Sequence, residues 1–154
     1  EDKAPYILKK YTIDVAEGGE KAITYRLEFP SSDKIKYNFI GIYDGDMRER
    51  LDTSKLNWKW LFLPGNKALE ELYREYLHVP ENLEKFCEIV GKEKKQIITM
   101  LATIDGNDYH DWFEELRKFL GIDGKMLVRN FYRIMQEMDK EIEEFIAELK
   151  KSIA

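Results

Sequence analysis

The sequence predicts an α/β fold, with a small sheet of three to five strands in the first 65 residues and a helix-rich C-terminal half. Two observations carry this prediction. Before residue 65, apolar residues alternate or gather in short β-branched and aromatic runs, whereas after it they recur every three or four residues. The chain has 154 residues, 44% of them hydrophobic, which is enough for one domain with a core. We expect a sheet region over residues 1–78 and a helical region over 79–154 packed on it.

The N-terminal segments are expected to form a hairpin. YTIDVA (11–16) alternates apolar and polar residues, as a half-buried strand does, and EGGE (17–20) is a turn or loop. AITYRLEF (22–29) fits two structures, because its apolar residues alternate, yet Ile23 and Leu27 would also share a helix face. Its β-branched and aromatic content favours a strand. Gly18-Gly19 would then close the hairpin.

Two further strands are expected before the helices begin. YNFIGIYD (37–44) is apolar on both faces near its end, which is typical of a central strand. WKWLFLPG (58–65) is predicted to form a strand that ends at Pro64 and Gly65.

The second half carries helix signals with clear ends. KALEELYREYL (67–77) places its apolar residues on one face, PENLEKFCEIVG (80–91) begins at proline and ends at glycine, and KEKKQIITMLATI (92–104) has helical spacing. NDYHDWFEELRKFLG (107–121) has an Asn or Asp cap and a glycine stop. One apolar stripe from Leu127 to Leu149 predicts a single last helix over about 125–152, long enough to contact a partner.

Charge and cysteine content exclude several classes of protein. The formal net charge is −5, so contact with nucleic acid would need a local basic patch, a bridging cation or a partner. Cys87 is the only cysteine, which excludes an intramolecular disulfide and a thiolate metal site. No apolar run approaches the ~20 residues that span a bilayer, and no basic-then-apolar leader is present. We therefore expect a cytoplasmic protein that does not enter a membrane.

The most informative motif is Asp44-Gly45-Asp46, directly after the predicted central strand. It is either an ordinary surface turn or a pair of metal ligands. Sites in open α/β sheets lie at the carboxyl ends of strands, and glycine lets two nearby carboxylates approach one hard cation. Glu17 and Glu20 flank the glycine pair and would reach the same edge if the first strand lies beside 37–44. Converging carboxylates repel one another unless a divalent cation compensates them.

These residues also carry a family resemblance. Glu17-Gly18 after a first strand, followed by Asp44-x-Asp46 after a buried strand, resembles the catalytic signature of TOPRIM domains. FLPGNKALEEL (62–72) and YHDWFEELRKFLG (109–121) are similar to the C-terminal part of OLD-family nucleases. In that family a TOPRIM domain follows an ABC-type ATPase, often in antiphage defence. The resemblance extends over about residues 11–150, but the segment between Glu17 and Asp44 is short for a TOPRIM domain, and a hairpin there does not match it.

The resemblance implies Mg²⁺-dependent (or Mn²⁺-dependent) endonuclease cleavage of DNA or RNA. It assigns metal binding and catalysis to Glu17, Asp44 and Asp46, while Glu20 and Glu70 would complete a second metal site. An ATPase domain or subunit is the implied partner, because the chain has no Gly-x4-Gly-Lys-Ser/Thr motif of its own.

The basic residues after the aspartate pair have two readings. Arg48, Arg50 and Lys55 are expected to contact phosphates of the nucleic acid, although a solvated loop is an equal alternative.

A second function stays open. The chain could be a degenerate TOPRIM-like module that performs no catalysis and binds another protein through its last helix and its tryptophans, or a second copy of itself through that helix.

Overall fold

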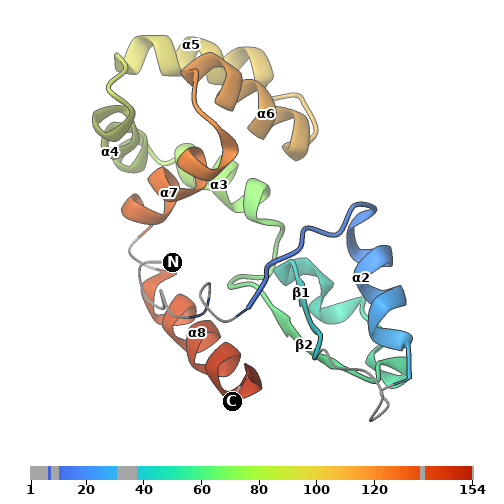
Figure 1. The fold of residues 1–154 in the computed structure, drawn as a ribbon. Coiled ribbons are helices and arrows are strands. Elements are labelled where there is room, and N and C mark those ends of the chain that lie inside the picture. Colours follow the sequence, from blue (N-terminus) through green and yellow to red (C-terminus); the bar gives the residue numbers. More distant parts are fainter. Residues whose placement is uncertain (1–6, 8–10, 31–37, 136–137, 154) are drawn as a thin grey trace. The chain divides into compact units, whose positions relative to one another are not determined.

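A computed structural model describes residues 7, 11–30, 38–135 and 138–153 of the chain. It confirms a mixed α/β structure, with seven α-helices and a two-stranded parallel sheet among the described residues. The chain folds into two compact units (Figure 1). The first contains Glu1–Asn66 together with Lys140–Ala154, and the second contains Lys67–Asp139.

The first unit is built on a helix packed against two parallel strands. Its elements are α2 (Gly19–Glu28), β1 (Ile40–Tyr43), the 3-10 helices η1 (Gly45–Glu49) and η2 (Thr53–Lys55), β2 (Lys59–Phe62) and most of α8 (Asp139–Ile153). The strand register places Ile40 opposite Lys59 and Tyr43 opposite Phe62. Leu27 from α2 and Tyr43 from β1 are buried together with Met47 and form the centre of this core.

The expectation of three to five strands is not confirmed, since the described residues form two. The strands predicted at 37–44 and 58–65 are found as β1 and β2. Residues 11–16 have no regular secondary structure, and the predicted strand and hairpin at 22–29 are wrong, because this segment forms α2. The alternating pattern would bury Tyr25 and Phe29, but these side chains are 65% and 52% exposed.

α2 lies so close to β1 that the strand has no room for a side chain at Gly41. A Cβ atom at this position would lie 2.4 Å from Leu27 Cδ1 and 3.0 Å from Ile23 Cγ2. Leu27 is 2% exposed and has little space to move aside. The glycine therefore sets the distance between the helix and the strand.

The second unit is a helical bundle. It consists of α3 (Leu69–Leu77), α4 (Pro80–Val90), α5 (Lys94–Ile104), α6 (Tyr109–Leu120) and α7 (Gly124–Ile134). Phe131 lies at its centre, with its ring stacked on Tyr73 at 4.3 Å and on Phe86 at 5.1 Å between centroids. The helices predicted over 67–77, 80–91, 92–104 and 107–121 are all confirmed with small changes at their ends.

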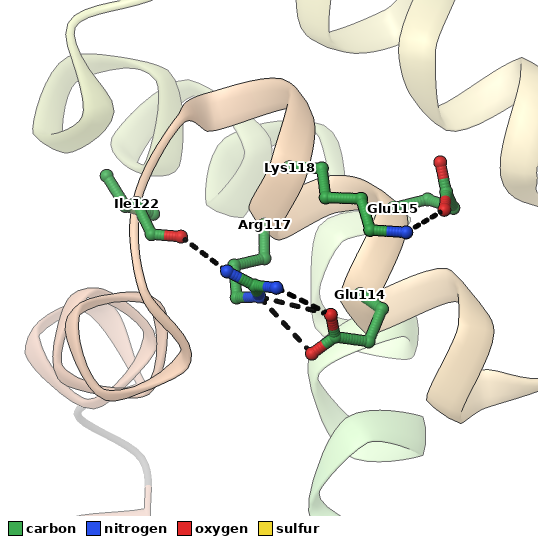
Figure 2. A network of polar contacts seen from close by, with 5 residues as sticks. All are labelled: Glu114, Glu115, Arg117, Lys118 and Ile122. Atoms are coloured by element: carbon green, nitrogen blue, oxygen red, sulfur yellow. Dashed lines mark hydrogen bonds and ion pairs between the residues drawn. The ribbon is translucent and has the colours of Figure 1, made fainter.

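The end of α6 shows why these boundaries could be predicted. Gly121 adopts a left-handed conformation with φ of 68° and its N–H bonds back to the last turn, as a C-terminal glycine does. Arg117 also stabilises this end of α6. Its guanidinium pairs with Glu114 at 2.7 Å and donates to the Ile122 carbonyl at 3.4 Å (Figure 2). This hydrogen-bonded pairing lowers the pKa of the Glu114 carboxyl.

The prediction of one helix over about 125–152 is wrong. α7 ends at Ile134 and α8 begins at Asp139, so the apolar stripe from Leu127 to Leu149 belongs to two helices. The buried hydroxyl of Tyr76, in α3, donates to the carbonyl of Ile134 where α7 stops. None of the helices in the described part of the chain is both long and apolar enough to cross a membrane.

Replacing Gly41 with alanine should weaken the packing of α2 on β1. The added methyl group would have to displace Leu27 and Ile23, and overpacking of this kind costs about 1–3 kcal/mol. Hydrogen exchange of α2 and β1 peptides, followed by mass spectrometry, should show correspondingly faster exchange. Gly106→Ala is the control, because a Cβ atom there has no neighbour within 4 Å. Unchanged protection of α2 in Gly41→Ala would contradict the close packing.

Candidate functional site

The aspartate pair lies at the carboxyl end of β1, where the sequence places it. Asp44 directly follows the strand and is half-buried, and it precedes the first turn of η1. Asp46 lies in that first turn with its side chain 31% exposed. Both carboxylates therefore occupy the sheet edge at which ligand sites form in α/β proteins.

Gly45 holds this turn against the loop that follows β2. A Cβ atom on Gly45 would lie 2.3 Å from the Gly65 carbonyl oxygen and 2.7 Å from its carbon. These are backbone atoms, which cannot rotate away as a side chain can. Only glycine fits between the two aspartates. Its contact with Gly65 holds the turn after β1 against the loop after β2.

A short hydrogen-bond chain ties the first turn of α2 to the same end of β1. The Thr24 hydroxyl donates to the Glu20 carbonyl oxygen at 2.8 Å. The Tyr43 hydroxyl lies 3.0 Å from Thr24 Oγ1, and either hydroxyl can donate in this hydrogen bond. These two hydrogen bonds connect the first turn of α2 to Tyr43, the last residue of β1. Neither Thr24 nor Tyr43 is among the site residues predicted from the sequence.

Glu20 and Asp46 meet at one guanidinium group. Arg50 Nη2 donates to Asp46 Oδ2 and lies 3.9 Å from Glu20 Oε2. The three side chains come from α2, from η1 and from the residue that follows η1. Their side chains are 47%, 31% and 59% exposed for Glu20, Asp46 and Arg50, so water reaches the cluster.

The full set of predicted metal ligands is not assembled. Glu17 is exposed in the turn before α2, and Glu70 lies in the second unit, where its Oε1 is 3.9 Å from His110 Nδ1. Within the described ranges, no group of three or more histidine, cysteine, aspartate or glutamate side chains is arranged to hold a metal ion. Of the five predicted ligands, the structure shows a shared partner for Glu20 and Asp46.

The three predicted phosphate-binding residues have different surroundings. Arg48 donates to the backbone carbonyls of Leu63 at 3.0 Å and Gly65 at 3.3 Å, and its guanidinium lies 5.1 Å from the centre of the Phe62 ring. Arg48 therefore stabilises the loop after β2. Arg50 pairs with the carboxylates, and Lys55 is 71% exposed, with its ammonium 4.0 Å from Asp52.

A surface cavity of about 420 Å³ opens beside this cluster. Glu20, Lys21, Arg50, Asp52 and Lys55 are among the residues that line it. Acidic and basic groups therefore alternate around one opening, and the Glu20–Arg50 contact faces it. A hydrated cation or a phosphate group can reach Glu20 and Arg50 from this side.

Glu20 and Asp46 are the two carboxylates that this cluster would offer to a hard divalent cation. Mg²⁺ retains several waters and is usually held by one or two carboxylates together with substrate phosphates. Glu20 and Asp46 offer that number of oxygen donors from separate elements, with Asp44 next to the turn. Arg50 supplies the positive charge between them in this conformation, so a cation bound there would replace its guanidinium.

Comparison of the chain with protein-family models, with curated proteins and with solved structures finds no match.

Replacing Tyr43 with phenylalanine should test the link between β1 and α2. Loss of one partly buried hydrogen bond lowers the free energy of unfolding by about 0.5–1.5 kcal/mol at neutral pH. Burial raises the pKa of the Tyr43 hydroxyl above its ordinary value, with the Thr24 hydrogen bond acting in the opposite direction. The unfolded chain therefore ionises first, and wild-type stability falls as the pH rises above about 10.

Urea denaturation at pH 8 and at pH 10.5 checks both effects. The stability difference between Tyr43→Phe and wild type should shrink at the higher pH, because the variant has no hydroxyl to ionise there. Tyr25→Phe is the control, since Tyr25 is 65% exposed. An equal change in Tyr25→Phe would show that Tyr43 has no special role.

Proposed function

We propose that the first unit is a TOPRIM-like, Mg²⁺-dependent nuclease domain that cleaves nucleic-acid phosphodiesters as part of an OLD-type ATPase system. The main support is the meeting of Glu20 and Asp46 at the carboxyl end of β1. Asp46 belongs to the Asp44-x-Asp46 motif of the resemblance, and Glu20 is one of the two residues that the resemblance assigns to a second metal site. The helix α2 adds support, because the resemblance requires a helix after Glu17-Gly18 and does not fit a hairpin.

In this proposal Glu20, Asp44 and Asp46 hold the cation. These residues would hold Mg²⁺, which would supply a water activated for attack and positive charge at the leaving oxygen of the phosphodiester. Other residues of the chain position these ligands. Gly45 keeps the aspartates against the sheet, and the Tyr43–Thr24 hydrogen bond keeps the first turn of α2 beside them. Glu17 and Glu70 stay predicted ligands, for which the described geometry offers no shared partner.

An acidic chain must overcome repulsion to bind a phosphate backbone. The cation supplies part of the positive charge, and Lys21 and Lys55 on the rim of the cavity supply more. An ATPase domain or subunit, the partner implied by the resemblance, would provide further contacts with DNA or RNA.

Asp46→Asn should abolish both divalent-cation binding and cation-dependent cleavage. The variant keeps the shape of the side chain but loses the charge that attracts Mg²⁺, so we expect at least a tenfold loss of Mn²⁺ affinity in electron paramagnetic resonance titrations. Nicking of supercoiled plasmid in Mg²⁺ or Mn²⁺, with the ATPase partner present, should fall to the level seen with EDTA. Asp44→Asn should behave in the same way.

Asp52→Asn is the matched control. Asp52 lines the same cavity, but its carboxylate caps η2 by accepting from the Ser54 N–H. This control should retain Mn²⁺ affinity and cleavage. Wild-type cleavage by Asp46→Asn would remove the basis of the nuclease proposal.

A second function, as a protein-interaction module without catalysis, is favoured by α8. None of the residues of this helix is fully buried, although Ile142, Phe145, Ile146 and Leu149 form an apolar stripe on it. Phe145 also lines a cavity of about 590 Å³ with Phe62 and Pro64. The lack of a three-ligand metal group within the described ranges supports the same reading.

Under this second function, Phe145→Glu should weaken association through α8. Sedimentation velocity of the wild-type chain over a concentration series should then show a reversible dimer, with Phe145→Glu sedimenting as a monomer. Glu144→Gln is the control, because it changes a neighbouring side chain of the cavity while leaving the apolar stripe intact. A monomeric wild-type chain at all concentrations would exclude self-association through this helix.

A further inference from the structure

The last helix, α8, is packed less tightly than the other helices of the described part of the chain. None of its residues is fully buried, whereas each of the other α-helices described has at least one buried side chain. The apolar residues of α8 are half-buried at most. Since helices in proteins gain most of their stability from packing an apolar face, α8 gains less than the others do.

Hydrogen bonds attach α8 to the first unit near both of its ends. In its first turn, Glu141 Oε2 accepts from the Gly65 N–H at 2.9 Å. In its last turn, two backbone carbonyls accept from the Lys59 ammonium and the Tyr11 hydroxyl, at 3.1 Å and 2.6 Å. Carbonyls in the last turn have no acceptable donor inside the helix, so these side chains satisfy groups that would otherwise bond to water.

Between these attachments, α8 borders an open surface cavity of about 590 Å³. Phe62 and Pro64 line it from β2 and the loop that follows, and Phe145 and Ala147 line it from α8. A tightly packed contact leaves few voids larger than a water molecule, so the middle of α8 is not closely fitted to the unit that it lies on. The hydrogen bonds at its two ends therefore carry much of its attachment.

The N-terminal attachment lies at the residue that contacts the turn Asp44-Gly45-Asp46, here called the aspartate turn. The Gly65 N–H donates to Glu141, and the Gly65 carbonyl oxygen would lie 2.3 Å from a Cβ atom on Gly45. Arg48, two residues after Asp46, donates to the same carbonyl at 3.3 Å and lines the cavity beside α8. Gly65 thus connects α8 to the aspartate turn through consecutive contacts.

We infer that α8 is a detachable helix whose docking stabilises the aspartate turn. In the docked state Glu141 holds Gly65, and Gly65 holds the turn. In the detached state Gly65 loses this acceptor, and the turn moves more freely while the rest of the first unit stays folded. A weakly packed element with two states can transmit such a change through a chain of contacts.

This device gives the candidate site a means of regulation. A partner that captured the apolar stripe of α8 would shift the equilibrium towards the detached state and would thereby loosen the turn. The inference requires neither a metal ion nor a nucleic-acid substrate, so it stands or falls separately from the nuclease proposal.

Amide hydrogen exchange of the full chain, resolved by NMR, tests for detachment. In wild type, the amides of α8 should exchange roughly tenfold or more faster than those of α2 and β1, because a local opening suffices to expose them. Their exchange should also be insensitive to low concentrations of urea, since a local opening exposes little new surface.

Glu141→Ala tests the link to the aspartate turn. The variant removes the acceptor of Gly65 but keeps a good helix former in α8. Exchange should rise about three- to tenfold in α8 and at the amides of Gly65, Met47 and Arg50, as expected for the loss of one hydrogen bond. The Met47 and Arg50 amides report on the turn and on η1, because both bond to backbone carbonyls of this segment.

A matched control and a second variant complete the experiment. Glu144→Ala makes the same substitution beside the same cavity, but the Glu144 carboxylate lies 3.9 Å from Lys140 of α8 itself, so exchange in the turn should not change. Lys59→Met removes an attachment at the opposite end of α8. If α8 detaches as one unit, this variant should also speed exchange at Gly65 and Met47. It leaves Glu141 in place, so it tests the same link even where Glu141→Ala is too unstable to study.

Each contrary result overturns a defined part of the inference. Exchange of α8 amides only through global unfolding, as slowly as in β1, would show that the helix does not detach. Faster exchange in α8 and at Gly65 with unchanged Met47 and Arg50 amides would show that detachment does not reach the turn. An equal effect of Glu144→Ala would assign the change to the lost negative charge and not to the bond with Gly65.

Discussion

The close packing of α2 against β1 at Gly41 is the constraint on which the candidate site depends. Because Gly41 has no side chain, Leu27 and Ile23 fill the space above the strand. This contact fixes the helix at its C-terminal half, while the Tyr43–Thr24 hydrogen bond fixes it one turn after Glu20. These two contacts position α2 on β1, and Glu20 lies in the first turn of this helix.

Gly45 positions the two aspartates, as Gly41 positions α2. Gly45 contacts the backbone at Gly65 so closely that the turn after β1 cannot slide along the loop after β2. Arg48 closes the other side of this contact through its bonds to the Leu63 and Gly65 carbonyls. The backbone of the site is thus held by packing and by backbone acceptors. Its side-chain charges, by contrast, are held by exposed ion pairs, which can exchange without loss of the fold.

The sequence predicted the second unit better than the first, for a physical reason. Helices such as α4 and α6 carry their own boundaries, with Pro80 and Gly91 or Asp108 and Gly121 at their ends, and these local signals need no tertiary information. The segment that became α2 carries Ile23 and Leu27 four residues apart. This spacing satisfies an alternating pattern and a helical one equally, so only the fit against Gly41 decides between them.

Long-range contacts account for the other errors. No glycine or proline marks the end of α7 at Ile134. The hydroxyl that donates to the Ile134 carbonyl belongs to Tyr76, which is far away in the sequence. In the candidate site, the motif Asp44-Gly45-Asp46 could be found by inspection, because a buried strand leads directly into it. The partner of Asp46 could not, since Arg50 is one of several basic residues after the turn, and only the fold distinguishes it from Arg48.

The different environments of these two arginines also bear on how an acidic protein can meet a phosphate backbone. A guanidinium bonded to backbone carbonyls, such as that of Arg48, is committed to the fold, and moving it would leave acceptors without a partner. A guanidinium paired with carboxylates is available whenever another cation satisfies those carboxylates. The local charge at the site is therefore not a fixed property of the sequence. Under the proposed function it would become more positive on binding of a divalent cation, because the ion would neutralise Glu20 and Asp46 while Arg50 keeps its charge. The net charge of −5 thus describes the whole chain, and it does not set the charge that a phosphate would meet at this edge of the sheet.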